Sequence, residues 1–260
     1  MMPLGRPGPM TEMERYVFDT WGYLVIPDAL TPQETQDCLE ASRRLYATLP
    51  QDAFRQLGNT FEQEPAFENL VDHPSTLPKA RALFGDRFIL QSSWLTMAPA
   101  GFRSGGGFHQ DGSGAYEFRR LGTPTPLVQL RTGFVLTDMS SEGMGNLALI
   151  PGSHNVSSTP PPGGVAGVPI THVVCAKPGS AIMFHQGVFH TATNNDMNHN
   201  RFIIHMVYSP PWLIRSDRMH NSPQFLERLT PMRRALMGEF TDAGKPFSSM
   251  KRLPFEDWGR

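Results

Sequence analysis

The sequence predicts a mainly β protein of the α+β class, in which helices precede a jelly-roll or cupin-like double sheet. Three observations favour this fold. The chain has 24 Gly and 24 Pro among 260 residues, which indicates many turns between short elements. Short β-prone segments separated by turn residues fill its middle part. Helical patterns occur before and after these segments, so we expect N-terminal helices packed on one sheet.

The first part of the chain carries the helix signals. Residues 22–27 are expected to form a short strand, after which Thr31 and Glu34 mark the start of a helix. Thr31 is a suitable N-cap, and Glu34 lies three residues later, where it completes a capping box. A second helix is predicted over residues 74–84, with Gly85 as its C-terminal stop.

The β-prone segments follow these helices, and each is bounded by turn residues. They are residues 88–97, 127–137, 146–150, 171–175, 181–184, 188–191 and 202–208. Alternation in the second segment puts Gln129 and Arg131 on the same face. Residues 112–126 are too polar and turn-rich for a strand, so we expect a loop there.

These patterns predict one domain with two extensions. We expect residues 1–15 to form a disordered leader and residues 16–210 to form the sheet domain with its N-terminal helices. Helical periodicity returns after two prolines at 210–211, so residues 211–260 are predicted to be a helical extension packed on the same domain.

Composition narrows the function classes. The net charge is −1, so no basic field points to nucleic acid. No run of about 18 apolar residues is present, as a membrane span would need. The leader lacks a signal-peptide core, and the cysteines, Cys38 and Cys175, suit a reducing compartment. We therefore expect a soluble cytoplasmic protein that binds neither nucleic acid nor a membrane. A monomer or homodimer is the expected state.

One motif carries metal chemistry. A glycine-rich segment leads into His109-Gln110-Asp111, and on a strand His109 and Asp111 would point to the same face. An imidazole and a carboxylate are two of the three ligands in the triad that holds non-haem Fe(II). The third ligand would come from a histidine downstream. His185, His190 and His205 are the candidates.

A resemblance rests on these residues taken together. The sequence His109-Gln110-Asp111, the turn residues 151–154 and His190 with Arg201 eleven positions later resemble the phytanoyl-CoA dioxygenase family. The resemblance covers roughly residues 16–208. It implies Fe(II)/2-oxoglutarate-dependent oxygenase activity on a double-stranded β-helix. His185 fits the family spacing to Arg201 poorly, so His190 is preferred.

The resemblance also implies roles for individual residues. His109, Asp111 and His190 would be the iron ligands, and Arg201 would bind the distal carboxylate of 2-oxoglutarate through its planar guanidinium. Further contacts to 2-oxoglutarate are expected from Gln91 and Gln129. The candidates for substrate contact are Phe108, Phe118, Arg119 and Arg131. His154 and His205 are expected to have structural roles.

The implied reaction consumes O2 and 2-oxoglutarate and releases succinate and CO2. Its most direct outcome is hydroxylation of an unactivated C–H bond in a small molecule, such as an intermediate of natural-product or secondary metabolism. Desaturation, epoxidation, cyclisation and rearrangement are alternative outcomes at such a site. Two rivals stay open: a non-catalytic cupin-like binding protein, and a metal-dependent enzyme that does not use 2-oxo acids.

Overall fold

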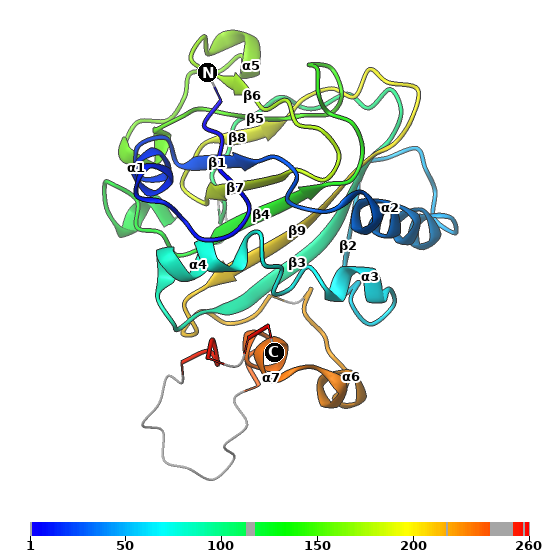
Figure 1. The fold of residues 1–260 in the computed structure, drawn as a ribbon. Helices are drawn as coiled ribbons and strands as arrows, with labels where there is room; N and C mark the ends of the chain where they lie inside the picture. Colours follow the sequence, from blue (N-terminus) through cyan, green and yellow to red (C-terminus); the bar gives the residue numbers. More distant parts are fainter. Residues whose placement is uncertain (1, 113–117, 217, 240–251, 257, 260) are drawn as a thin grey trace.

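A computed structural model describes residues 2–112, 118–216, 218–239, 252–256 and 258–259, and it shows an α+β fold built on two antiparallel sheets (Figure 1). The larger sheet has six strands in the order β1-β7-β4-β9-β3-β2, and the smaller has three in the order β6-β5-β8. Strands that are distant in the sequence thus lie side by side in both sheets. This confirms the predicted mainly β, jelly-roll architecture.

The strands are short, as the turn-rich sequence indicates. The larger sheet contains β1 (Tyr23–Ile26), β2 (Arg55–Gly58), β3 (Ile89–Ala98), β4 (Leu130–Val135), β7 (Ala181–His185) and β9 (Arg201–Ser209). The smaller sheet contains β5 (Leu147–Leu149), β6 (His172–Val173) and β8 (His190–Ala192). An isolated antiparallel bridge between His109 and His190 adds a further pairing beside β8.

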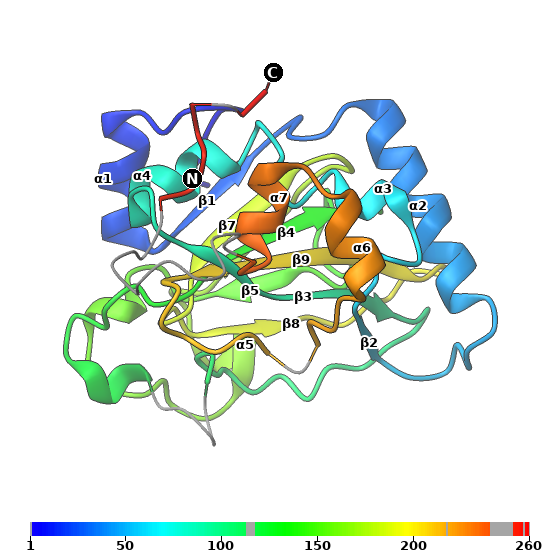
Figure 2. The same cartoon turned by 90° about the horizontal axis from the view of Figure 1, so that it is seen from below.

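Helices cover one face of the larger sheet (Figures 1 and 2). They are α1 (Glu12–Trp21), α2 (Pro32–Tyr46), α3 (Pro65–Glu68), α4 (Leu77–Phe84), α6 (Pro223–Arg228) and α7 (Pro231–Leu236); α5 (Gly164–Gly167) lies in the loop before β6. The capping box predicted for Thr31 and Glu34 is present at the start of α2. Gly85 follows α4 in a positive-φ conformation, as the C-terminal stop requires. None of these helices is long and apolar enough to cross a membrane.

Alternation along the strands separates two apolar clusters. Leu24, Met183 and Ile204 face the helices and join the larger cluster. Their neighbours Val25, Ile182 and Ile203 belong to a second cluster on the inner face, between the sheets. Because successive strand residues point to opposite faces, the same chain segments supply both the core under the helices and the lining of the interior.

The prediction of a disordered leader over residues 1–15 is wrong for the part of it that the structure describes. Leu4 forms a parallel bridge with Val25, and the Gly5 amide donates a hydrogen bond of 2.7 Å to the Val25 carbonyl. Helix α1 already begins at Glu12. The buried Lys79 ammonium lies 2.8 Å from the Glu14 carboxylate, so an ion pair ties this segment to α4.

The C-terminal extension is helical and continuous with the domain. Met232 and Leu236 of α7 join the large cluster under β3, and Leu253 is buried there too. Before these helices, the Ser216 amide donates a hydrogen bond of 2.9 Å to the carbonyl of Gln91 on β3. Residues 240–251 of the predicted extension lie outside the described residues. The described residues after 210 that are named here therefore pack on the sheet domain.

Candidate metal centre and its cavities

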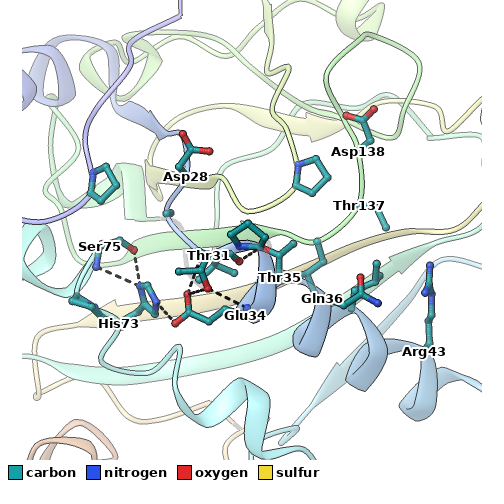
Figure 3. A pocket seen from close by; sticks show the side chains of 18 of the residues that line it. Asp28, Thr31, Glu34, Thr35, Gln36, Arg43, His73, Ser75, Thr137 and Asp138 are labelled. Carbon is teal, nitrogen blue, oxygen red and sulfur yellow. Dashed lines mark hydrogen bonds and ion pairs between the residues drawn. The ribbon is translucent and has the colours of Figure 1, made fainter.

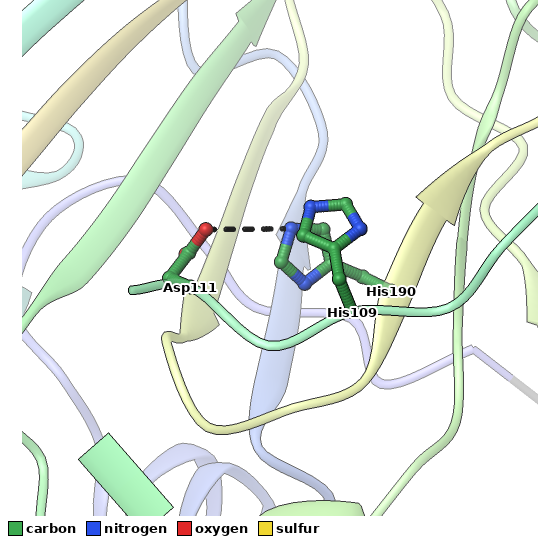
Figure 4. A group of neighbouring side chains, drawn as sticks. All are labelled: His109, Asp111 and His190. Atoms are coloured by element: carbon green, nitrogen blue, oxygen red, sulfur yellow. Dashed lines mark ion pairs between the residues drawn. The ribbon is translucent and has the colours of Figure 1, made fainter. Parts of the chain in front are cut away.

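His109, Asp111 and His190 converge between the sheets, with one ligand atom from each within 4.8 Å of the others (Figure 4). The His190 Nε2 atom lies 3.7 Å from Asp111 Oδ1, and the two imidazole centroids are 4.4 Å apart. Asp111 and His190 are buried, whereas His109 is exposed. Two nitrogens and one carboxylate, with access from one side, match the donor set of a non-haem Fe(II) site.

The backbone fixes the positions of these three side chains. The His109 and His190 amides donate hydrogen bonds of 3.1 and 2.9 Å to each other's carbonyls, and the Asp111 amide donates one of 3.0 Å to Gln186. The expected continuous strand through His109 and Asp111 is absent from the described structure, because the pairing stops after the single bridge at His109. A turn then carries Asp111 back toward His190.

Two buried polar atoms in this group have no hydrogen-bond partner in the part of the chain that the structure describes. They are His190 Nε2 and Asp111 Oδ2. The other nitrogen of His190, Nδ1, lies 2.9 Å from the Val188 carbonyl, which favours the tautomer with a proton on Nδ1 and a free lone pair on Nε2. Burial lowers the pKa of His190 to about 4, so the imidazole is neutral. A buried unpaired acceptor is costly unless a cation occupies the space beside it.

A small cavity of about 120 Å³ adjoins His109 and His190. Arg201 lies in its wall, is only 4% exposed, and has a buried Nε atom without a partner. Burial lowers the pKa of Arg201 to about 10, which still leaves the guanidinium charged at neutral pH. The wall also contains Thr96 and His205, whose Oγ1 and Nδ1 atoms likewise lack partners. The cavity therefore offers several polar atoms that lack partners among the described residues, grouped around the buried Arg201 guanidinium.

A second cavity of about 640 Å³ lies on the other side of Trp94 and Arg131, and Asp111 reaches it too. Gln91 and Gln129 line this cavity rather than the one with Arg201. The Gln129 amide donates a hydrogen bond of 3.1 Å to Gln91, and Gln91 donates one of 2.9 Å to the Ile214 carbonyl. This glutamine pair thus connects β3 to the C-terminal segment.

A β-bulge explains the direction of Gln91. Pairing of β3 with β9 shifts between Leu90 and Ser92, so Gln91 has no partner of its own in the ladder. A bulge changes which face the extra residue occupies and bends the strand. Gln91 consequently contacts the segment beyond residue 210, which cannot be read from the strand alternation alone.

Arg131 borders both cavities. Its guanidinium forms an ion pair with Asp111 and lies 4.7 Å from the ring centroid of Trp94. Its side chain is 19% exposed. Burial lowers the pKa of Arg131, the Asp111 carboxylate raises it, and the nearby Arg218 lowers it further. This side chain therefore lies beside Asp111 and contributes to the walls of both cavities.

The other predicted residues lie farther from the centre or have structural contacts. His185 packs against His154, with ring centroids 4.7 Å apart, and does not join the three-residue group. Phe108 packs against a small cluster around Phe189. Phe118 lines the larger cavity, whereas Arg119 is exposed on the same short 3-10 turn, Phe118–Leu121. Residues 113–117 of the predicted loop lie outside the described residues.

Sequence reasoning missed several residues that line the two cavities. Thr96 carried a signal, because it lies two residues after Trp94 and alternation places both on the inner face. No sequence signal predicted that Trp212 and Arg218 line a cavity, because they follow the last strand in a segment without hydrophobic periodicity. Only the folded chain shows that this segment forms a wall.

A larger hollow of about 1090 Å³ lies at the start of α2, away from these side chains (Figure 3). Asp28, Thr31 and Glu34 contribute to it, and His73 lies 3.2 Å from Glu34. Its lining includes none of the three converging ligands. The two smaller cavities, unlike this hollow, adjoin the converging side chains.

Residues 18–203 match the model of the family described as phytanoyl-CoA dioxygenase (PhyH). The chain belongs to the phytanoyl-CoA dioxygenase family. As a member, it is an Fe(II)/2-oxoglutarate-dependent dioxygenase that uses O2. No functionally curated protein matches the sequence.

Solved structures with the same fold include HygX and two enzymes of nogalamycin biosynthesis. HygX from Streptomyces hygroscopicus, with nickel and 2-oxoglutarate bound, is 17% identical with a TM-score of 0.68 over 80% of this chain and 90% of HygX. The carbocyclase SnoK from nogalamycin biosynthesis is 19% identical with a TM-score of 0.62 over 78% of this chain and 87% of SnoK. The epimerase SnoN of the same biosynthesis is 19% identical, with a TM-score of 0.60 over 75% of this chain and 79% of SnoN. These likenesses show that this chain has the same fold as HygX, SnoK and SnoN.

Proposed function

We propose that His109, Asp111 and His190 hold Fe(II) and that Arg201 binds the distal carboxylate of 2-oxoglutarate. The observation that carries this proposal is the convergence of unpartnered buried polar atoms. His190 Nε2, Asp111 Oδ2 and Arg201 Nε all lack partners within the described residues. A dication at the first two and a carboxylate at the third would satisfy each of them.

The protein's own groups divide the work around that site. Bound Fe(II) with 2-oxoglutarate and O2 supplies the oxidising power. The His109–His190 bridge holds two ligands in place, and the Val188 carbonyl fixes the His190 tautomer. Arg201 orients 2-oxoglutarate, and the smaller cavity keeps bulk water away from it. The larger cavity, which touches Asp111, is the place for the substrate.

The substrate we propose is a natural-product intermediate that is hydroxylated at an unactivated C–H bond. Support comes from HygX, which has been crystallised with hygromycin B, and from the SnoK carbocyclase and SnoN epimerase. The same relatives keep cyclisation and rearrangement open as outcomes for this chain. A cytoplasmic location is part of the proposal, supported by the free cysteines Cys38 and Cys175. A monomer or homodimer suits this role.

The test is turnover of 2-oxoglutarate by purified protein with Fe(II) and O2. We expect slow release of succinate without substrate and faster release with one. His190→Ala and Arg201→Met should abolish it, whereas Arg103→Gln should not, because Arg103 is an exposed side chain paired with Asp196. Retention of 2-oxoglutarate turnover in Arg201→Met would contradict the assigned role of Arg201. Metal binding without any succinate from the wild type would instead favour a cupin-like binding protein.

A further inference from the structure

Two arginines meet at one tryptophan in the wall of the larger cavity. The guanidinium carbons of Arg131 and Arg218 each lie 4.7 Å from the ring centroid of Trp94. Both side chains line the cavity that also contains Asp111. Arg131 comes from β4, whereas Arg218 comes from the segment after β9, so the fold brings together two like charges from distant parts of the chain.

The charges of these two arginines are poorly balanced. Arg218 donates a hydrogen bond of 2.9 Å to the neutral amide oxygen of Gln56. Among the described residues that line the cavity, Asp111 is the one carboxylate, and it pairs with Arg131. A dication bound at Asp111 would share that negative charge. Arg131 and Arg218 would then be two neighbouring cations, one of them largely buried, with no further carboxylate among the described residues of the lining.

Aromatic side chains surround this charged corner. Trp94 and Phe118 are buried in the lining, and Trp212 is 62% exposed. Trp94 contacts both guanidinium groups through cation–π interactions, and their N–H groups that are not used for Asp111 or Gln56 remain for a planar or tetrahedral anion. The remaining lining offers apolar surface and the Gln91–Gln129 amides.

We propose that Arg131 and Arg218 together bind an anionic group of the substrate, a carboxylate or a phosphate, against Trp94. The substrate class is thus an organic acid or phosphate ester with an apolar body that lies along Phe118 and Trp212. This inference rests on the proposed function, since it takes the larger cavity as the substrate site. It adds Arg218, which lies outside the barrel strands, as a residue that determines specificity.

Matched probes test the charge requirement. Protein loaded anaerobically with Fe(II) and saturating 2-oxoglutarate is titrated calorimetrically with 3-phenylpropanoate, with its neutral amide 3-phenylpropanamide, and with 2-phenylethyl phosphate. Saturating 2-oxoglutarate occupies Arg201, so the acid cannot bind there. We expect at least one of the two anions to bind about tenfold more tightly than the amide, as charged hydrogen bonds allow. The stronger anion distinguishes carboxylate from phosphate recognition.

Two arginine variants from one segment separate the site from general charge. Arg218→Gln should lower the affinity for the preferred anion about tenfold and leave the amide unchanged. Arg215→Gln removes a charge from the same segment, but Arg215 donates to the Met237 carbonyl at 2.6 Å, so this variant should keep the preference. Equal affinity of the wild type for anions and amide, absence of anion binding, or equal losses in both variants would overturn the proposal.

A second readout on the same samples distinguishes this inference from the proposed function. The charge-transfer absorption of the Fe(II)–2-oxoglutarate chelate should be present in the wild type and in Arg218→Gln. If the wild type lacks the absorption, the proposed function fails whatever the probes do. If the absorption is present but anions have no advantage, only the inference about Arg131 and Arg218 fails.

Discussion

His109 and His190 are joined by two backbone hydrogen bonds, of 3.1 and 2.9 Å, so that their imidazole centroids lie 4.4 Å apart. This isolated bridge connects His109, which belongs to the glycine-rich segment and to no strand, to the first residue of β8. The two imidazoles are therefore held close together by the main chain. Positioning of this kind lowers the entropic cost of binding a metal between them.

The first prediction concerns the choice between two histidines. His190→Ala should weaken Fe(II) binding beyond the ~10–100-fold that loss of an outer-shell partner causes, because one of three ligands is removed. His185→Gln should keep metal affinity, since His185 packs against His154. Equilibrium dialysis with metal analysis measures both. A metal site lost in His185→Gln and kept in His190→Ala would reverse the assignment.

The second prediction uses two glycines with similar backbone geometry. Gly145 and Gly143 have φ values of +70° and +82°, so alanine strains both by about 1–2 kcal/mol. A Cβ atom at Gly145 would lie 3.2 Å from Arg201 Nε, whereas one at Gly143 would approach the Asp196 carboxylate. Gly145→Ala should therefore weaken 2-oxoglutarate binding several-fold, and Gly143→Ala should not. The affinity of each variant for 2-oxoglutarate is measured by titration, with the charge-transfer absorption of the Fe(II)–2-oxoglutarate chelate as the signal. Equal affinities in the two variants would contradict the prediction.

The third prediction concerns the glutamine pair. Gln129→Ala should leave the dissociation constant for 2-oxoglutarate within about twofold of the wild type, because Gln129 lines the larger cavity and not the one with Arg201. Its effect should instead appear in the affinity for the anionic probes or the substrate. A large rise in the dissociation constant for 2-oxoglutarate would contradict this prediction. It would support the contact between Gln129 and 2-oxoglutarate that the family resemblance implies.

The fourth prediction concerns the ion pair under the N-terminal segment. Lys79→Met should lower the free energy of unfolding by about 3–5 kcal/mol, because it leaves the Glu14 carboxylate buried and unpaired. Arg15→Met breaks an exposed pair with Asp19 and should cost less than about 1 kcal/mol. Urea unfolding measures both. Similar losses in the two variants would show that the buried pair has no special weight.

The fifth prediction concerns acid stability. Burial, and then the charge of His154, lowers the pKa of His185 to about 3, whereas the unfolded chain has a value of about 6.5. Between these values the unfolded state binds more protons, so stability is present above pH ~6.5 and is lost as the pH falls. Urea unfolding from pH ~7 to ~5 should show a slope that is shallower in His185→Gln, by a difference that grows to about 1.4 kcal/mol per pH unit as the pH approaches ~5. An unchanged slope would mean that His185 is not buried neutral.

Local signals in the sequence predict the parts of the fold that depend on near neighbours. The Thr31–Glu34 capping box and the stop at Gly85 need only a few residues of context, and both are present. Alternation in β4 likewise puts Gln129 and Arg131 on one face, and both line the larger cavity. Family resemblance, rather than periodicity, favours His190 over His185, and the structure places His190 beside His109 and Asp111.

Contacts between distant segments could not be predicted in the same way. The β-bulge at Gln91 changes the face that alternation assigns, and its cause is the register of β3 against β9. The leader is held by a bridge from Leu4 to Val25 and by the ion pair to Lys79, which lies far along the chain. Arg218 reaches Trp94 only because the chain returns past β3 after the last strand. Each of these features depends on contacts between segments that are distant in the sequence. Neither the amino-acid composition nor the periodicity of hydrophobic residues predicts such contacts.

The segment that follows β9 contributes to the larger cavity but supplies none of the proposed iron ligands. A chain ending at residue 210 would keep His109, Asp111, His190 and Arg201 but lose Trp212 and Arg218, and with them one side of the larger cavity. In the proposed mechanism, residues before 210 bind Fe(II) and 2-oxoglutarate, whereas Trp212 and Arg218 in the segment after residue 210 contribute to substrate specificity. Exchanging that tail among related enzymes would be a direct way to redirect the oxidation to new molecules while the iron-binding framework stays untouched.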